Sequence, residues 1–154
     1  GVQTCALPIC SGIETEGKHC VVVGRSHIVG SPMSILLARN SNPGNCTVTL
    51  CHSRTKNLKE ICQTADILIA ALGKPEFIDK SFMKDGVIVI DVGIHRVPSS
   101  ESPKGYLLKG DVVSRDMQDM ASAYTPVPGG VGPMTIVSLL KNTLLAAKKQ
   151  IYNS

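Results

Sequence analysis

Four short stretches of the chain carry the side chains expected of buried strands. Three are continuously apolar, at 20–23, 67–70 and 87–90, and the fourth, at 47–50, alternates threonine with valine and leucine. Each closes near a glycine or a polar turn. Short apolar runs with such boundaries are typical of parallel strands that are covered on both faces. The pattern therefore predicts four strands of a parallel sheet.

Helical spacing of apolar residues separates these strands. Ser31 and Pro32, an N-cap residue followed by a proline at the first helical position, predict a helix start after the first strand. Further helices are predicted around 58–62, around 82–83 and from 133 to about 151. This alternation predicts one α/β domain, a Rossmann-like parallel sheet with helices on both faces. The polar segment 97–106 predicts a surface excursion.

Composition narrows the classes of partner. Aromatic residues make up 3% of the 154 residues and tryptophan is absent, which argues against stacking platforms for single-stranded nucleic acid. The net charge of +4 comes from scattered basic residues, and no apolar stretch approaches the length of a membrane span. We expect neither a nucleic-acid partner nor a membrane.

The six cysteines form no Cys-x-x-Cys motif and have no histidine at zinc-ligand spacing, so no metal site is expected. Cys20, Cys46 and Cys51 lie within or beside apolar runs. We interpret them as small buried hydrophobes of a reducing compartment, the cytoplasm.

The first candidate site is the segment 24–30 (GRSHIVG), between the first predicted strand and its helix. A glycine-rich turn there lets the backbone approach a pyrophosphate at the helix N-terminus. The match to Gly-x-Gly-x-x-Gly is imperfect, because Ser26 replaces the middle glycine and one extra residue precedes Gly30. A tight turn that uses glycine for geometry alone remains an alternative.

The second candidate follows the strand at 47–50. NAD-binding proteins place an acidic residue near this point to hold the ribose, whereas this chain has Ser53, Arg54 and Lys56. Donors and positive charge suit a 2′-phosphate, which favours NADP. A solvated basic helix start is the alternative.

Glycines also follow two further strands, at 71–73 (ALG) and 91–94 (DVGI), where open α/β sheets bind ligands. The segment 125–135 (TPVPGGVGPMT) is a constrained loop that opens the last helix and can present backbone groups to a planar ligand. Asp91 and Asp111 are interpreted as residues that cap a helix or a turn. The four histidines have no nucleophile partner in sequence and receive no catalytic role.

Taken together, these motifs resemble the methylenetetrahydrofolate dehydrogenase/cyclohydrolase family over about residues 11–152. The matching segments are VVGRSxIVGxPM at 22–33, TVTxCHSRT at 47–55, ADIL at 65–68, VIDVGI at 89–94, GDV at 110–112 and TPVPGGVGPMT at 125–135. The resemblance implies an enzyme of one-carbon metabolism that serves purine biosynthesis. Such an enzyme oxidises 5,10-methylenetetrahydrofolate with NADP and hydrolyses the methenyl product to 10-formyltetrahydrofolate.

The resemblance also implies roles for individual residues at the cofactor's phosphate end. Gly24, Arg25 and Ser26 should hold the phosphates and ribose of NADP. Ser53, with Arg25, should hold the 2′-phosphate.

At the reactive end, the resemblance implies that Ile94 contacts the nicotinamide side and that Thr135 anchors the carboxamide. Pro128, Gly129 and Gly130 should border the tetrahydrofolate substrate. The last helix of the family runs toward a preceding domain, so we expect part of the 133–151 helix to be exposed.

The chain departs from the family in one large respect. The family's preceding domain carries a Tyr-x-x-x-Lys motif that acts on the folate, and no tyrosine of this chain has a lysine at that offset. Residues 1–9 resemble a translated sequencing-adapter oligonucleotide, so we expect 1–10 to be an artificial leader and 11–152 to be the NAD(P)-binding domain without its catalytic N-terminal domain. The chain alone should be inactive, and its parent enzyme should be a homodimer.

Two other interpretations stay open at this point. A non-catalytic NADP-binding module would explain the missing Tyr-x-x-x-Lys. A different NADP-dependent dehydrogenase of similar half-sheet architecture would have no reason to contain the loop at 128–135.

Overall fold

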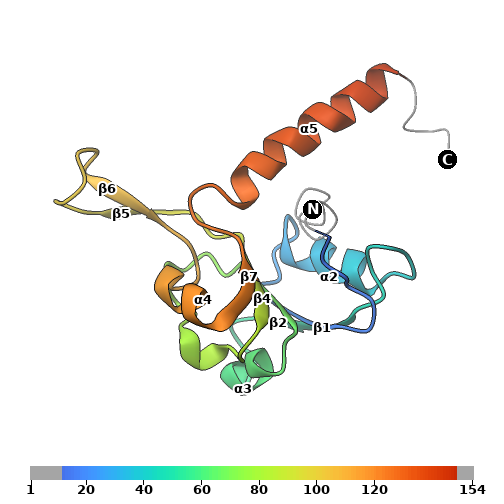
Figure 1. Cartoon of the computed structure of the whole chain (residues 1–154), viewed down its shortest axis with the longest axis horizontal. Coiled ribbons are helices and arrows are strands. Elements are labelled where there is room, and N and C mark those ends of the chain that lie inside the picture. The colour runs from blue at the N-terminus through green and yellow to red at the C-terminus, as the bar shows by residue number, and fades with distance from the viewer. Residues whose placement is uncertain (1–11, 149–154) are drawn as a thin grey trace.

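The computed structural model describes residues 12–148, so the expected leader at 1–10 and the far end of the last predicted helix lie outside the described residues. Its centre is a five-stranded parallel sheet in the order β2-β1-β3-β4-β7 (Figure 1). The strands are β1 (His19–Val23), β2 (Thr47–Cys51), β3 (Ile67–Ala70), β4 (Val87–Asp91) and β7 (Ala121–Tyr124). The predicted strands and the predicted fold class are confirmed.

The central strands are apolar at successive positions because both faces of the sheet are covered. All four residues of β3 are buried. Leu68 and Ala70 belong to a core cluster on one face, and Ile67 and Ile69 belong to a second cluster on the other. A strand with only one buried face would instead alternate apolar and polar residues.

Helices from different parts of the chain supply the two covers. The 3₁₀ helix η1 (Lys80–Phe82) and the helices α3 (Leu58–Gln63) and α4 (Ser114–Met120) lie over one face, to which they contribute Phe82, Cys62 and Met117. The helix α2 (Gly30–Ala38) lies over the other face through Met33 and Leu37 (Figure 1).

The start of α2 corrects the sequence prediction. Ser31 and Pro32 lie inside the first turn, and the helix begins at Gly30. The capping side chain is Ser26, whose Oγ accepts hydrogen bonds from the backbone N–H of Val29 at 3.1 Å and of Gly30 at 3.5 Å. A serine four residues before the helix thus does what the adjacent serine was expected to do.

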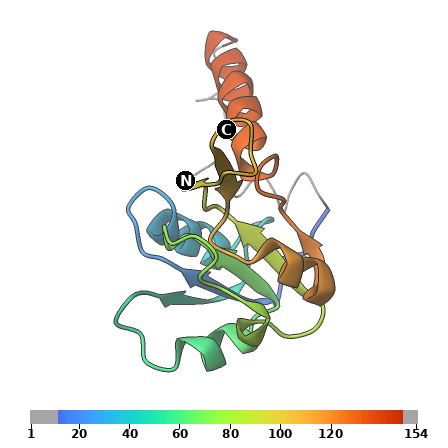
Figure 2. The same cartoon turned by 90° about the vertical axis from the view of Figure 1, so that its left-hand side faces the viewer.

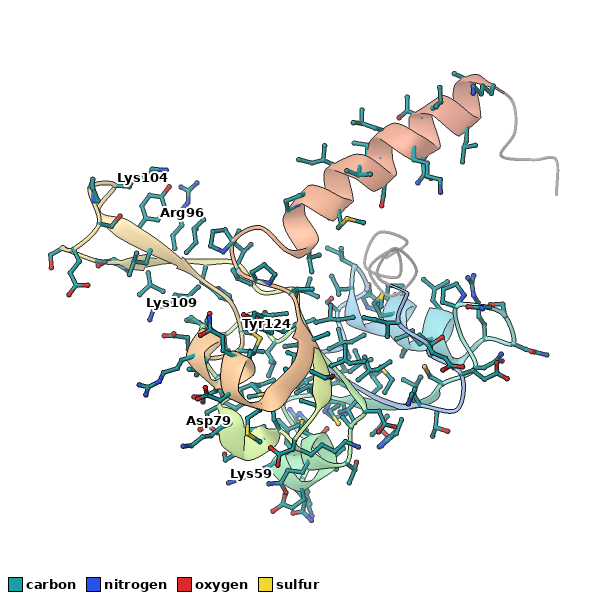
Figure 3. All side chains as sticks on the ribbon, in the orientation of Figure 1. Lys59, Asp79, Arg96, Lys104, Lys109 and Tyr124 are labelled. Atoms are coloured by element: carbon teal, nitrogen blue, oxygen red, sulfur yellow. The ribbon has the colours of Figure 1, made fainter. Side chains whose placement is uncertain are left out.

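Residues around the predicted surface excursion form an antiparallel hairpin that projects from the body (Figure 1). Its strands are β5 (His95–Pro98) and β6 (Tyr106–Lys109), and the guanidinium of Arg96 lies 5.1 Å from the ring centroid of Tyr106. Figure 3 shows Arg96, Lys104 and Lys109 along this hairpin. The elements α4 and β7 were not predicted either, because short segments with one or no buried residue carry little apolar signal.

The final helix, α5 (Val131–Ala147), projects away from the sheet (Figures 1 and 2). It begins two residues before the predicted start and contains no buried residue. Ile136, Leu140 and Leu144 are 62%, 65% and 54% exposed. The expectation that this helix would be partly exposed is confirmed. Among residues 12–148, no helix is long and apolar enough to cross a membrane.

The interpretation of the cysteines as buried hydrophobes is confirmed for Cys20, Cys46 and Cys51. Cys62 is buried beside Cys51, and burial raises the pKa of the Cys62 thiol to about 12. Burial also raises the pKa of Cys51. These thiols stay protonated and act as packing groups.

Candidate functional site

Three adjoining cavities follow the carboxyl edge of the sheet. The first, of about 460 Å³, lies where β1, β2 and β3 end, and it includes Gly24, Arg25, Ser26 and Ser53. The second, of about 440 Å³, lies between the end of β4 and the loop that precedes α5. Because parallel strands all end at one edge, residues far apart in sequence meet there.

A connecting cavity of about 230 Å³ joins the other two. It shares Ser26 with the first cavity, and it shares Gly93 and Ile94 with the second. The second cavity contains the remaining residues of the predicted site, Pro128, Gly129, Gly130 and Thr135. All nine predicted residues therefore line one continuous track.

Gly24 sits at the point where the chain connections leave β1 and β3 in opposite directions along the sheet. Its φ is +119°, and a Cβ there would lie 2.0 Å from the backbone oxygen of Ala71. A Cβ on Gly30 would lie 1.7 Å from the backbone oxygen of Gly24. The two glycines are thus required by close backbone packing between β1, β3 and α2, in addition to any ligand. Sequence reasoning had considered the ligand contact and the turn geometry, and it missed the contact with Ala71.

The turn after β2 holds Ser53 at an exposed tip. The backbone N–H of His52 donates to Thr55 Oγ1 at 2.8 Å, and the backbone N–H of Thr55 donates to the carbonyl of His52 at 2.9 Å. The backbone N–H of Arg54 donates to His52 Nδ1 at 3.2 Å. These bonds close the turn. Ser53 is exposed at its tip and lines the first cavity.

The charge lining the first cavity is positive. Its charged residues are Arg25 and Lys74, and no aspartate or glutamate among residues 12–148 lines it. The first turn of α2, whose N-terminus follows the same loop, contains no acidic residue. A helix N-terminus carries partial positive charge, so the cavity suits a ligand with several phosphates.

Two buried aspartates fasten the loops between the cavities. The carboxylate of Asp111 accepts hydrogen bonds from the backbone N–H groups of Leu72, Gly73 and Lys74, at 2.6 to 3.0 Å. His95 Nε2 lies 2.7 Å from the same carboxylate. The turn after β3 and the start of β5 are therefore held by one side chain.

Asp91 fastens the chain in the same way at the end of the neighbouring strand β4. Its carboxylate accepts hydrogen bonds from the backbone N–H groups of Gly93, Asp111 and Val112. Burial raises the pKa of Asp91, and the three N–H donors oppose that rise. Of the two capping roles predicted for these aspartates, both carboxylates cap turns. Sequence reasoning missed the His95–Asp111 contact because β5 was not predicted.

The loop before α5 is shaped by its own backbone. A Cβ on Gly130 would lie 2.6 Å from the carbonyl oxygen of Pro126, and Gly129 has a φ of +108°. Thr125 is buried, and its Oγ1 accepts a hydrogen bond from the backbone N–H of Asp91 at 2.8 Å. This bond ties the loop to the end of β4, so the second cavity has two fixed walls.

Ile94 and Thr135 both line the second cavity, with different surroundings. Ile94 is 64% exposed, so it offers an apolar surface to the cavity. Thr135 is partly buried, and its hydroxyl donates to the carbonyl of Val131 at 3.2 Å. Among residues 12–148, no group of three or more His, Cys, Asp or Glu side chains could hold a metal ion.

Comparison with known proteins agrees with this geometry. The family model described as the NAD(P)-binding domain of tetrahydrofolate dehydrogenase/cyclohydrolase matches residues 4–151. This chain belongs to that family. The match includes most of the expected leader at 1–10, which stays a prediction.

Relatives and solved structures of this family are close. Proteins named bifunctional protein FolD are 64% identical over 137 residues in Cytophaga hutchinsonii and 62% identical over 136 in Flavobacterium johnsoniae. The match to the FolD structure from Campylobacter jejuni covers 97% of this chain, at 41% identity and a TM-score of 0.85. The FolD structure from Trypanosoma brucei, complexed with NADP and an inhibitor, gives 97% coverage, 40% identity and a TM-score of 0.84.

The chain spans about half the length of the relatives that it matches. Its match takes up 47% of the Cytophaga hutchinsonii protein and 50% of the Campylobacter jejuni structure, against 89% and 97% of this chain. The other half of each relative has no counterpart among these residues.

Proposed function

We propose that this chain is the NADP-binding half of a methylenetetrahydrofolate dehydrogenase/cyclohydrolase. The parent enzyme oxidises 5,10-methylenetetrahydrofolate to 5,10-methenyltetrahydrofolate and hydrolyses that product to 10-formyltetrahydrofolate in the cytoplasm. The observation that carries the proposal is the single track of cavities that gathers all nine family-matched residues at the sheet edge. The resemblance to a FolD structure described as an NADP complex supports the choice of cofactor.

The first cavity fits the phosphate-bearing half of NADP. Gly24, Arg25 and Ser26 would hold the diphosphate and ribose at the start of α2, where charge and helix dipole favour anions. Ser53 would donate to the 2′-phosphate, with Arg25 as its cation. The absence of an aspartate or glutamate from this cavity's lining is the observation that fits a 2′-phosphate, since a carboxylate there would repel it.

The second cavity fits the reactive half. Ile94 would give the nicotinamide an apolar surface and exclude water from it, and Thr135 would fix the carboxamide. Pro128, Gly129 and Gly130 would border the folate with backbone rather than side chains. NADP⁺, when bound, supplies the hydride acceptor of the dehydrogenase step. No residue of this chain is assigned as the general acid or base.

We also propose that α5 contacts the domain that carries Tyr-x-x-x-Lys in the parent enzyme, and that the parent is a homodimer. The support is the exposed row of Ile136, Leu140 and Leu144, which recur at four-residue spacing on one side of a helix with no buried residue. Apolar patches of this kind usually mark a contact surface.

Reconstitution tests the proposed function. The chain alone should show neither dehydrogenase nor cyclohydrolase turnover. A fusion that places the unmatched half of the Cytophaga hutchinsonii relative before residue 11 should show both activities. We expect the family's Tyr-x-x-x-Lys motif in that half, and changing the motif's lysine to alanine gives the control.

Turnover by the bare chain would contradict this division of labour. An inactive fusion that still binds NADP would favour the non-catalytic module instead.

A further inference from the structure

Lys74 and Phe77, on the wall of the first cavity, are not used in the roles given above. Both side chains line the cavity together with the turn that carries Ser53. Phe77 is 40% exposed, and Lys74 is exposed as well. Phe77 thus offers a half-exposed aromatic face to a cavity whose charged residues are the basic Arg25 and Lys74, and such a face can stack on a planar ligand.

The backbone that carries these two side chains is firmly held. The N–H of Lys74 donates to Asp111 Oδ1 at 3.0 Å. The residues on either side of Phe77 are also tied, since Glu76 N–H donates to the carbonyl of Gly110 at 2.9 Å and Ile78 N–H donates to the carbonyl of Asp111 at 3.0 Å. The backbone of this wall is therefore held in place, and only the two side chains can change their conformation.

The ammonium of Lys74 lies 5.3 Å from the centroid of the Phe77 ring, so the two side chains form a cation–π contact. The ion pairs found among residues 12–148 are Lys84–Asp66, His95–Asp111 and Lys109–Glu76, and Lys74 belongs to none of them. The nearest acidic residue in sequence, Glu76, is occupied by Lys109. When an anionic ligand binds, the Lys74 ammonium therefore gives up only an exposed contact with the Phe77 ring.

We propose that Lys74 and Phe77 form the wall that recognises the adenosine half of the cofactor, a proposal that rests on the proposed function. Phe77, backed by Phe82 with their ring centroids 5.9 Å apart, receives the adenine ring on the face that Lys74 covers. Lys74 turns from that face to a phosphate of the cofactor. The exchange is favourable because a charge-assisted hydrogen bond to phosphate is stronger than an exposed cation–π contact, and the adenine replaces the ammonium on the ring.

Calorimetric titration of variants tests this wall. The variants are Lys74→Met, which keeps the apolar stem without the charge, and Phe77→Leu, which keeps apolar volume without the ring. The matched controls are Lys59→Met on α3 and Tyr106→Leu on the hairpin, because neither residue lines any of the three cavities (Figure 3 labels Lys59). The ligands are NADP⁺ and adenosine 2′,5′-bisphosphate, which contains the adenosine half alone.

Lys74→Met should weaken binding of both ligands about tenfold, and Phe77→Leu should weaken both about fivefold. The controls should bind within about twofold of wild type. All four variants should keep the wild-type unfolding midpoint because their side chains are exposed or on the hairpin. A variant that lowers the midpoint is replaced by Lys74→Gln or Phe77→Met.

If wild type binds both ligands and both cavity variants bind them with wild-type affinity, the proposed role of Lys74 and Phe77 is wrong, while the proposed function stands. Loss of affinity for NADP⁺ with no change for adenosine 2′,5′-bisphosphate would place the two residues elsewhere on the cofactor and would also overturn it. No binding by wild type would instead refute the proposed function.

Discussion

The helices α2 and α5 follow similar loops but differ in how far their apolar side chains are buried. Each begins after a glycine-containing loop at the carboxyl edge of the sheet, and each carries apolar residues at helical spacing. Met33 and Leu37 of α2 are fully or almost fully buried, whereas α5 has no buried residue and contributes only a partly buried side chain, Val131, to the core. Helical periodicity thus predicts the helix, while the cover for its apolar side depends on what lies beside it. In α5, that cover is not supplied by residues 12–148.

The largest expected difference between the two helices is in stability. Met33→Ala should lower the free energy of unfolding by about 2 to 5 kcal/mol, because it leaves a cavity under a helix that covers the sheet. Leu140→Ala, at a side chain that is 65% exposed, should change it by no more than about 0.5 kcal/mol. Denaturant unfolding of both variants measures the contrast. Equal losses would show that α5 packs on the body in solution.

A second effect concerns association through α5. We expect the purified chain to self-associate through the exposed row of α5, which residues 12–148 leave uncovered. The double change Leu140→Gln and Leu144→Gln interrupts that row and should reduce the association. Ser138→Gln, on the same helix, is the control. Sedimentation velocity over a range of concentrations gives the readout. Identical association by wild type and the double variant would mean that copies meet through another surface.

The smallest expected effect is a difference in the pH dependence of stability between a variant in the sheet body, at Asp66, and a variant in α5. The ammonium of Lys84 and the backbone N–H of His19 hold the pKa of Asp66 below its usual range. A lowered folded-state pKa gives stability that is present above the unfolded-state pKa and is lost as pH falls through the folded-state value. The carboxylate is partly exposed, so the gain is modest.

Asp66→Asn should therefore lower stability near neutral pH and narrow its difference from wild type below about pH 4. The Leu140→Ala variant of α5 should follow the wild-type pH dependence throughout. Unfolding midpoints measured between about pH 3 and pH 7 test both statements. If the difference in unfolding midpoint between Asp66→Asn and wild type is the same at every pH, the ionised carboxylate of Asp66 does not contribute to stability.

The strands at the centre of the sheet were predictable from sequence because residues such as Leu68 and Ile69 must be apolar when both faces are covered. Strand β7 and the hairpin were not, since residues such as Ala121 and Arg96 lie at the edge of the sheet or outside it and have little apolar signal. The start of α2 was misplaced because the capping serine acts across an intervening loop.

The predicted site residues come from motifs, and the sheet edge gathers them as expected. What could not be predicted was how the motifs depend on one another. Asp111 holds the turn that carries Lys74, and Ala71 leaves no room for a side chain on Gly24. Such contacts join residues that lie far apart in the chain, and no local pattern records them.

The most direct test of the central claim, that the sheet edge of this chain holds NADP, is a calorimetric titration of the purified chain with NADP⁺ and with NAD⁺. NADP⁺ should bind at least about tenfold more tightly, because a 2′-phosphate gains charge-assisted hydrogen bonds at a cavity without carboxylates. Ser53→Ala should reduce that preference and leave NAD⁺ affinity unchanged. Equal affinities, a preference for NAD⁺, or no binding of either dinucleotide would contradict the account.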